Sequence, residues 1–187
     1  MAATLHDMAD PRIPLPDFLV LDASVILRLH PHLTHRYQTV AQNFLTRAQR
    51  SARRNEVLLL LPYLALEECY FNICKFVLQD ICGQGNYWHE YYKNNPHQLS
   101  QAYPQLAHLR QILRSFPMKI LEPDDLVASS PAPVRLSTRM LEFVRDFQVL
   151  PKDAAILAEA ERVGAHTVAT LDADWSRADG FDVIMPI

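Results

Sequence analysis

The sequence predicts an α/β protein built on a parallel sheet, and two patterns support this prediction. Short, fully apolar runs such as residues 18–21 and 57–61 have the length and composition of strands that are covered on both faces. Segments with helical periodicity alternate with these runs, as they do in parallel α/β sheets. Apolar residues make up 49% of the 187 residues and charged residues 21%, which is the composition of one globular domain, with or without an insertion.

The first half of the chain is expected to form an arm followed by alternating strands and helices. Residues 1–17 contain several prolines, which lack an amide donor, so we expect a polar arm that joins no regular element. A single domain, residues 18–187, begins after this arm. Its first elements are expected to be a strand at 18–21, a helix at 34–55, a strand at 57–61 and a helix that ends near residue 80.

The middle of the domain, residues 79–134, is expected to be a helical and aromatic insertion. Residues 79–104 are polar and aromatic and show no sustained period, whereas residues 105–115 are helical and 118–121 form a strand. Pro131 and Pro133 then break the chain. The last third has the clearest pattern, with helices and strands expected at 135–147, 151–164, 167–171 and 182–185.

Charge, hydropathy and cysteine content exclude several classes of protein. The formal net charge of −3 excludes a strongly basic protein that coats nucleic acid. The longest apolar stretch, residues 57–66, is roughly half as long as a membrane-spanning helix. The N-terminus lacks the basic start and apolar core of a signal peptide, so we expect a cytoplasmic protein. Three cysteines without a paired CxxC unit indicate neither a disulfide framework nor a zinc site.

Acidic residues follow the expected strands, at the carboxyl ends where parallel α/β proteins bind ligands. Asp22 follows the first strand, Glu67 and Glu68 follow the second within one or two helical turns, and Asp172 and Asp174 follow a strand of the last third. Each aspartate has a structural alternative, because Asp at a strand end also forms turns with its own backbone. Periodicity does not choose between the two glutamates, since their helix is apolar nearly all round.

Asp153 is the third residue of the helix that Pro151 opens. An acid in the first turn of a helix is favoured by the helix dipole, so a purely structural role is open. Asp153 nevertheless lies on the same stripe as Ile156 and Leu157, which belong to the apolar face of this helix. Both roles, dipole partner and ligand, are compatible with the sequence.

Taken together, these acids point to a divalent metal. Carboxylates at neighbouring strand ends repel one another unless a cation is bound. An environment made of oxygen ligands suits Mg²⁺ or Mn²⁺ and disfavours zinc. Acidic clusters that hold these ions serve phosphoryl chemistry. We therefore expect Mg²⁺ or Mn²⁺ as the cofactor.

Four segments resemble, in order, the acidic motifs of the PIN-domain ribonucleases, a family that includes VapC-like toxins. The segments are FLVLDAS (18–24), LPYLALEE (61–68), LPKDAAI (150–156) and TLDADW (170–175). The resemblance covers roughly residues 17–75 and 135–187. It implies a PIN-like three-layer α/β/α fold with a flavodoxin-like strand order of 3-2-1-4-5. It also implies a metal-dependent endoribonuclease in which water attacks single-stranded RNA and leaves 5′-phosphate and 3′-hydroxyl ends.

The resemblance also implies site residues. Glu68 matches the second acid better than Glu67, because the family commonly has an apolar residue directly after this glutamate, here Cys69. The implied metal ligands and catalytic acids are Asp22, Glu68, Asp153 and Asp172, with Asp174 as a further catalytic acid. The implied supporting hydroxyls belong to Ser24 and Thr170.

The partners implied by the resemblance are a single-stranded RNA substrate and, if the similarity to toxins extends so far, an antitoxin protein and a second copy of the chain in a homodimer. The interval of 85 positions between Glu68 and Asp153 exceeds that of compact toxins, which bears on a toxin role more than on the nuclease fold. The alternative function is a non-catalytic PIN-like module that binds RNA or protein. A phosphatase that forms an aspartyl phosphate is disfavoured, because Ser24 stands where it needs a second Asp.

Two surface features suit an RNA substrate, and each has an alternative. Arg47, Arg50 and Arg54 share one helical face that is suited to RNA phosphates, although such a run is more often a solvated surface. The aromatic residues between positions 87 and 92 suit base stacking, a protein interface or packing within the insertion.

Overall fold

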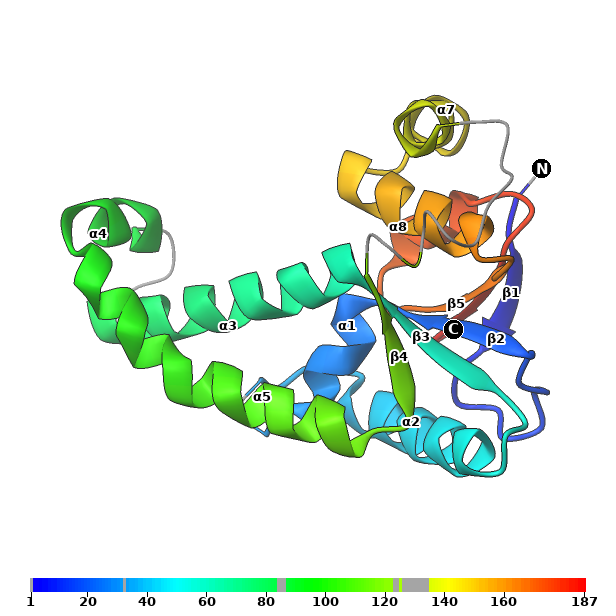
Figure 1. Ribbon diagram of the computed structural model, residues 1–187, viewed down its shortest axis with the longest axis horizontal. Helices are drawn as coiled ribbons and strands as arrows, with labels where there is room; N and C mark the ends of the chain where they lie inside the picture. Colours follow the sequence, from blue (N-terminus) through cyan, green and yellow to red (C-terminus); the bar gives the residue numbers. More distant parts are fainter. Residues whose placement is uncertain (1, 32, 84–86, 123–124, 126–134) are drawn as a thin grey trace. The chain divides into compact units, whose positions relative to one another are not determined.

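The structure of the protein is a computed structural model that describes residues 2–31, 33–83, 87–122, 125 and 135–187. The chain divides into two compact units. One unit consists of Met1–Leu66 and Pro117–Ile187, and it contains the sheet (Figure 1). The other, Glu67–Phe116, is helical and is called the helical unit below.

In the described part of the chain the sheet has six strands, all parallel, in the order β1-β6-β5-β2-β3-β4. When β1 is left out and β2 is counted as the first strand, the order read from β4 to β6 is 3-2-1-4-5. The predicted α/β fold and its strand order are therefore confirmed. The central strands are buried on both faces, which is why they appear in the sequence as short apolar runs. The strands are β1 (Thr4–Asp7), β2 (Phe18–Leu21), β3 (Leu58–Pro62), β4 (Met118–Leu121), β5 (Thr167–Ala169) and β6 (Asp182–Met185).

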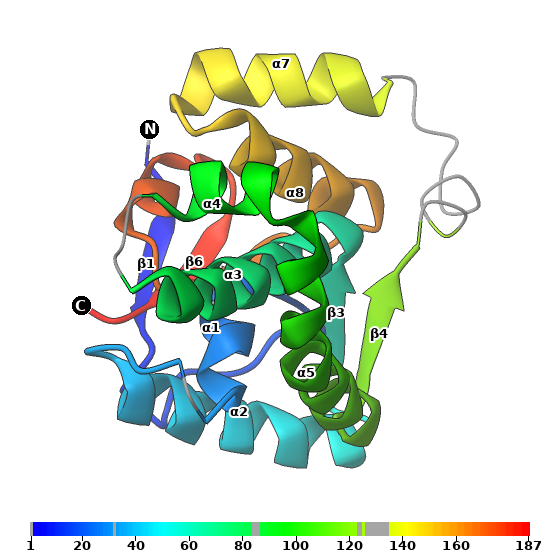
Figure 2. The same cartoon turned by 90° about the vertical axis from the view of Figure 1, so that its left-hand side faces the viewer.

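Helices cover both faces of the sheet and produce three layers (Figure 2). One face carries α1 (Ala23–Ile26) and α2 (Gln38–Arg53), and the other carries α8 (Pro151–Arg162), with α7 (Leu136–Phe147) packed on α8. The middle of α8 is fully inside the protein, since every residue from Ala154 to Ala160 is buried. Both α2 and α8 contact β3, which lies between β2 and β4.

The expectation that residues 1–17 join no regular element is wrong for the start of this arm. Thr4–Asp7 form β1, which pairs in parallel with β6 so that Thr4 lies beside Asp182. The prolines all come later, in the connection from β1 to β2, and therefore remove no hydrogen bond from the sheet.

Arg47 of α2 holds this connection in place. Its Nη1 donates to the backbone carbonyls of Asp10, Pro11 and Ile13 at 3.3, 2.7 and 3.0 Å. Burial lowers the pKa of this half-buried guanidinium. Arg47 thus has a structural role, and of the three arginines expected to share an RNA-binding face only Arg50 and Arg54 are exposed.

The helical unit is built on α3 (Tyr63–Cys82), whose first residues precede the unit, and on α5 (Tyr103–Ser115). Between them lie α4 (Trp88–Asn94) and the 3-10 helix Pro96–Ala102, where the sequence showed no sustained period. The ring of Trp88 meets that of Phe71 edge-on at 5.6 Å between centroids, which supports the packing role for this aromatic residue.

The expected breaks at Pro131 and Pro133 lie outside the described residues. Within the described residues, no helix combines the length and the apolar character that crossing a membrane requires.

Candidate active site

Asp22 follows β2 directly and is the centre of a hydrogen-bond network. It caps α1, and its Oδ2 accepts from the Ser24 amide at 3.2 Å. The same oxygen accepts from Ser24 Oγ at 2.5 Å and from Thr170 Oγ1 at 2.9 Å. Only 6% of Asp22 is exposed. Two hydroxyl groups therefore fix the orientation of a buried carboxylate.

The network joins the ends of two neighbouring strands, β2 and β5. The amide of Leu171 donates to Ser24 Oγ at 2.9 Å, and the amide of Asp172 donates to Thr170 Oγ1 at 3.1 Å. The hydroxyls of Ser24 and Thr170 thus hold both the Asp22 side chain and the backbone that carries Asp172. Of the residues implied by the sequence motifs, the structure brings these four together.

The electrostatic environment of Asp22 disfavours its charged form. Burial raises the pKa of this carboxyl, and the hydrogen bonds from Ser24 and Thr170 act in the opposite direction. These donors are hydroxyls and amides, which bring no positive charge to the carboxylate. A charge buried in this way is costly, and a bound cation would offset that cost.

Asp172 and Asp174 lie at the surface, after β5. Asp172 caps the 3-10 helix Ala173–Arg177, and its Oδ1 accepts from the Asp174 amide at 2.9 Å. The Asp174 carboxylate forms an ion pair with Arg177 at 3.0 Å. The side chains of Arg177 and Asp174 are 45% and 53% exposed, so this ion pair is open to solvent and stabilises the protein little.

Asp153 and Glu68 stand on helices. Asp153 is half-buried in the first turn of α8, which Pro151 opens. Glu68 lies on α3 within the helical unit and is half-buried, whereas Glu67 is exposed. Among the residues that the structure describes, no three His, Cys, Asp or Glu side chains gather so as to hold a metal ion. Asp153 and Glu68 thus remain ligands predicted from the sequence.

The donor atoms around Asp22 nevertheless suit Mg²⁺ or Mn²⁺. Asp22, Asp172, Ser24 and Thr170 offer oxygen atoms from carboxylates and hydroxyls, which hard cations prefer. Mg²⁺ in particular is usually bound by one or two carboxylates together with waters and substrate phosphates. A buried carboxylate joined through Thr170 to an exposed aspartate supplies such a partial ligand set.

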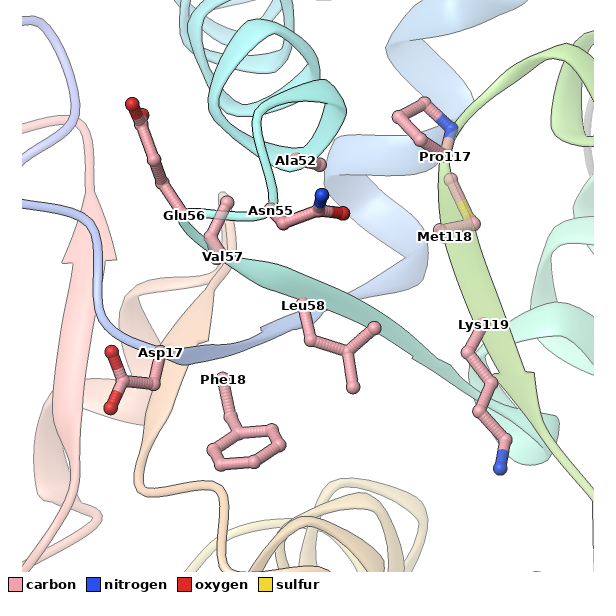
Figure 3. Close-up of a pocket in the computed structure, with 10 residues that line it drawn as sticks. All are labelled: Asp17, Phe18, Ala52, Asn55, Glu56, Val57, Leu58, Pro117, Met118 and Lys119. Carbon is pink, nitrogen blue, oxygen red and sulfur yellow. The ribbon is translucent and has the colours of Figure 1, made fainter.

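A cavity of about 550 Å³ lies at the amino ends of β2, β3 and β4, opposite the strand ends that carry the predicted site (Figure 3). Phe18 and Leu58 line it with their side chains pointing to the same side of the sheet, and each is 42% exposed. None of the residues that line it belongs to the predicted site. Parallel α/β proteins bind ligands at the carboxyl ends of their strands, whereas this cavity lies at the amino ends, where no active site is expected.

Two buried charged residues were not predicted from the sequence. Arg28 is 7% exposed and donates to the carbonyls of Ser24 at 3.2 Å and Leu33 at 3.0 Å, which braces the segment after Asp22. Glu159 of α8 is 5% exposed, and among the described residues its Oε2 has no hydrogen-bond partner. The sequence indicates the burial of these two residues only weakly, since Arg28 stands between two leucines and Glu159 between two alanines.

Comparison with known proteins shows a similarity to a solved structure. No protein-family profile matches the sequence, and no curated protein does. A crystal structure of VapBC2 from Rickettsia felis bound to a DNA fragment from their promoter aligns over 90% of this chain and 98% of that chain, with 11% identity and a TM-score of 0.49. This similarity is too low to transfer function, and the fold of the protein is defined by its own strand order.

Proposed function

We propose that this protein is a metal-dependent endoribonuclease that cleaves single-stranded RNA. The observation that carries the proposal is the buried Asp22 carboxylate, which neutral donors hold at the ends of two adjacent parallel strands. The sequence motifs support it, since Asp22, Ser24, Thr170 and Asp172 occupy positions that the PIN-domain pattern gives to acids and hydroxyls.

In this proposal Asp22, Glu68, Asp153 and Asp172 hold one or two Mg²⁺ or Mn²⁺ ions, and Asp174 assists. When bound, such an ion polarises the phosphodiester, lowers the pKa of a water molecule and stabilises the leaving oxygen. Glu68 and Asp153 enter the proposal through the sequence motifs alone.

The residues of the network prepare the site for reaction. Ser24 and Thr170 hold Oδ2 of Asp22, so the carboxylate keeps one orientation and needs no rearrangement during catalysis. Water attacks the phosphorus and the 3′-oxygen leaves, which yields a 5′-phosphate and a 3′-hydroxyl. Arg50 and Arg54, both exposed on or beside α2, are proposed contacts for the RNA phosphates.

Purified protein is expected to cut single-stranded RNA when Mg²⁺ or Mn²⁺ is present and to stop when EDTA is added in excess. Gel electrophoresis of an end-labelled oligonucleotide measures the cleavage, and ligation of the products identifies their 5′-phosphates. Cleavage that continues in EDTA would contradict the metal requirement.

One observation favours a second candidate, a non-catalytic module that binds RNA or protein. It is the lack, among the described residues, of a three-residue group that could hold a metal. Absence of cleavage with either ion, for RNA that the protein binds, would favour this candidate. A homodimer and an antitoxin partner belong to the nuclease proposal and rest on the resemblance to VapC-like toxins.

Asp153→Asn distinguishes a metal ligand from a partner of the helix dipole. A dipole partner stabilises its helix by roughly 0.3–1 kcal/mol, so its loss would lower the melting temperature in EDTA. In the proposed site the same change relieves repulsion between carboxylates, and we expect the melting temperature in EDTA to rise. Mn²⁺ at a hundredfold excess over its Kd should stabilise the wild type by about 2.7 kcal/mol and the variant much less.

Thermal melts of both proteins, in EDTA and in Mn²⁺, measure these differences. Asp146→Asn, which changes an exposed ion pair on α7, serves as the control and should respond to Mn²⁺ as the wild type does. If Asp153→Asn melts lower in EDTA and gains as much from Mn²⁺ as the wild type, Asp153 is not a ligand.

A further inference from the structure

A groove of about 400 Å³ is lined by residues of α3 and α5. These are the two long helices of the helical unit (Figure 1). All of the residues that line it belong to Glu67–Phe116. Tyr70 contributes from α3, and α5 contributes Tyr103, Leu106, Arg110 and Arg114. None of these residues takes part in the network around Asp22, so the groove is a separate feature of the molecule.

Two arginines make the α5 wall of the groove positive. Arg110 and Arg114 are four residues apart and share one helix face, about 6 Å from each other along the axis. Both are exposed, and within the part of the chain that the structure describes neither forms an ion pair. From Tyr91 to Phe116 the sequence contains no Asp or Glu. Although the protein has a net charge of −3, this stretch is positively charged and attracts anions.

Aromatic rings complete the groove. Tyr103 is 71% exposed at the start of α5, and Tyr70 is half-buried opposite the α5 residues. An exposed tyrosine ring offers a flat face on which an unpaired base can stack. Leu106 adds an apolar contact beside it.

This combination fits one class of ligand better than others. Single-stranded nucleic acid presents phosphates to guanidinium groups and unpaired bases to aromatic rings. An acidic peptide would pair with the arginines but would make no use of the exposed ring of Tyr103. A duplex would keep its bases stacked inside and would likewise leave the ring unused.

We propose that the groove between α3 and α5 binds a single-stranded stretch of RNA, with phosphates on Arg110 and Arg114 and a base stacked on Tyr103. The identification of this RNA as the substrate rests on the proposed nuclease function. Binding of single-stranded RNA in the groove does not depend on it.

The test measures binding of a fluorescent oligouridylate to the full-length protein in EDTA over a range of salt concentrations. Each phosphate contact with a single strand contributes about 0.7 to the slope of log Kd against log salt. The double variant Arg110→Gln/Arg114→Gln is therefore expected to bind more weakly and to lose about 1.4 from this slope. The control Arg12→Gln/Arg145→Gln removes the same charge from exposed ion pairs and should keep the wild-type slope.

Stacking is tested separately at one salt concentration. Tyr103→Ala is expected to weaken binding roughly 5- to 150-fold, the range found when a stacking residue is removed. Tyr103→Phe keeps the ring and should bind as the wild type does.

The outcomes separate the groove from the nuclease function. An unchanged Kd and slope in the double variant, with its melting temperature preserved, would overturn the proposal. Equal affinity for polyglutamate and oligouridylate would also overturn it and would indicate an acidic protein partner. A wild type that binds through the groove yet cuts no RNA would support the groove and remove the nuclease function. A double variant that cuts RNA with an unchanged KM would overturn the groove as a substrate site.

Discussion

Asp22→Asn is expected to reduce RNA cleavage by roughly 10²- to 10³-fold, which corresponds to the several kcal/mol that a metal site contributes to the transition state. Asn has the shape of Asp and retains one oxygen that can accept hydrogen bonds from Ser24 and Thr170. It lacks the negative charge that would hold a divalent cation. The loss should therefore appear in the rate of cleavage and leave the fold in place.

Initial rates on a labelled oligonucleotide in Mn²⁺ measure this effect, with melting temperatures in EDTA as the test of folding. Because burial raises the pKa of Asp22, removing its charge is expected to leave the melting temperature equal to or above that of the wild type. Thr170→Val keeps the carboxylate but removes one of the hydroxyls that orient it, so a smaller loss of about 10- to 100-fold is expected. Wild-type rates in Asp22→Asn would exclude Asp22 from catalysis.

Glu159→Gln is expected to stabilise the protein by about 3 kcal/mol at alkaline pH. Burial raises the pKa of Glu159 from an ordinary value of 4.5 to about 7, and each unit of such a change corresponds to about 1.4 kcal/mol. Gln has nearly the same shape and is never charged, so it avoids this cost while keeping the packing of α8.

The pH dependence has a definite sign. The folded protein holds the Glu159 proton more tightly than the unfolded chain does, so stability is greatest below the unfolded pKa and falls as the pH rises through about 7. Urea unfolding of wild type and Glu159→Gln between about pH 5 and pH 8 should show a difference in free energy that grows with pH. A difference that is the same at every pH would mean that Glu159 titrates normally in the folded protein.

Most of the sheet could be predicted because its central strands are recorded locally in the sequence. A strand that is covered on both faces is apolar throughout, and the predicted strand at 18–21 coincides with the central strand β2, whose last three residues are buried. β1 was missed because its residues, Thr4–Asp7, are only partly buried and show no apolar run. It lies at the sheet edge and, among the described strands, pairs only with β6, so it needs no such run.

The candidate site could be predicted only where it follows from strand ends. Asp22 directly follows β2, and Asp172 lies three residues past the end of β5. Because β2 and β5 are neighbours in the sheet, the segments that carry the two aspartates lie close together. Burial of Arg28 and Glu159 depends on how helices pack, which no local pattern records. Helical periodicity placed Arg47 on a solvent-facing stripe, but the arm covers that position with three carbonyl groups.

β1 also matters for self-association. Without it, β6 would become the edge of the sheet, and the backbone of the buried residues Val183, Ile184 and Met185 would present unpaired amides and carbonyls to other chains. Apolar edge strands of this kind favour edge-to-edge aggregation. The hydrogen bonds of Arg47 to the arm help to keep β1 on this edge. By covering the edge of β6, β1 therefore protects the protein against edge-to-edge aggregation.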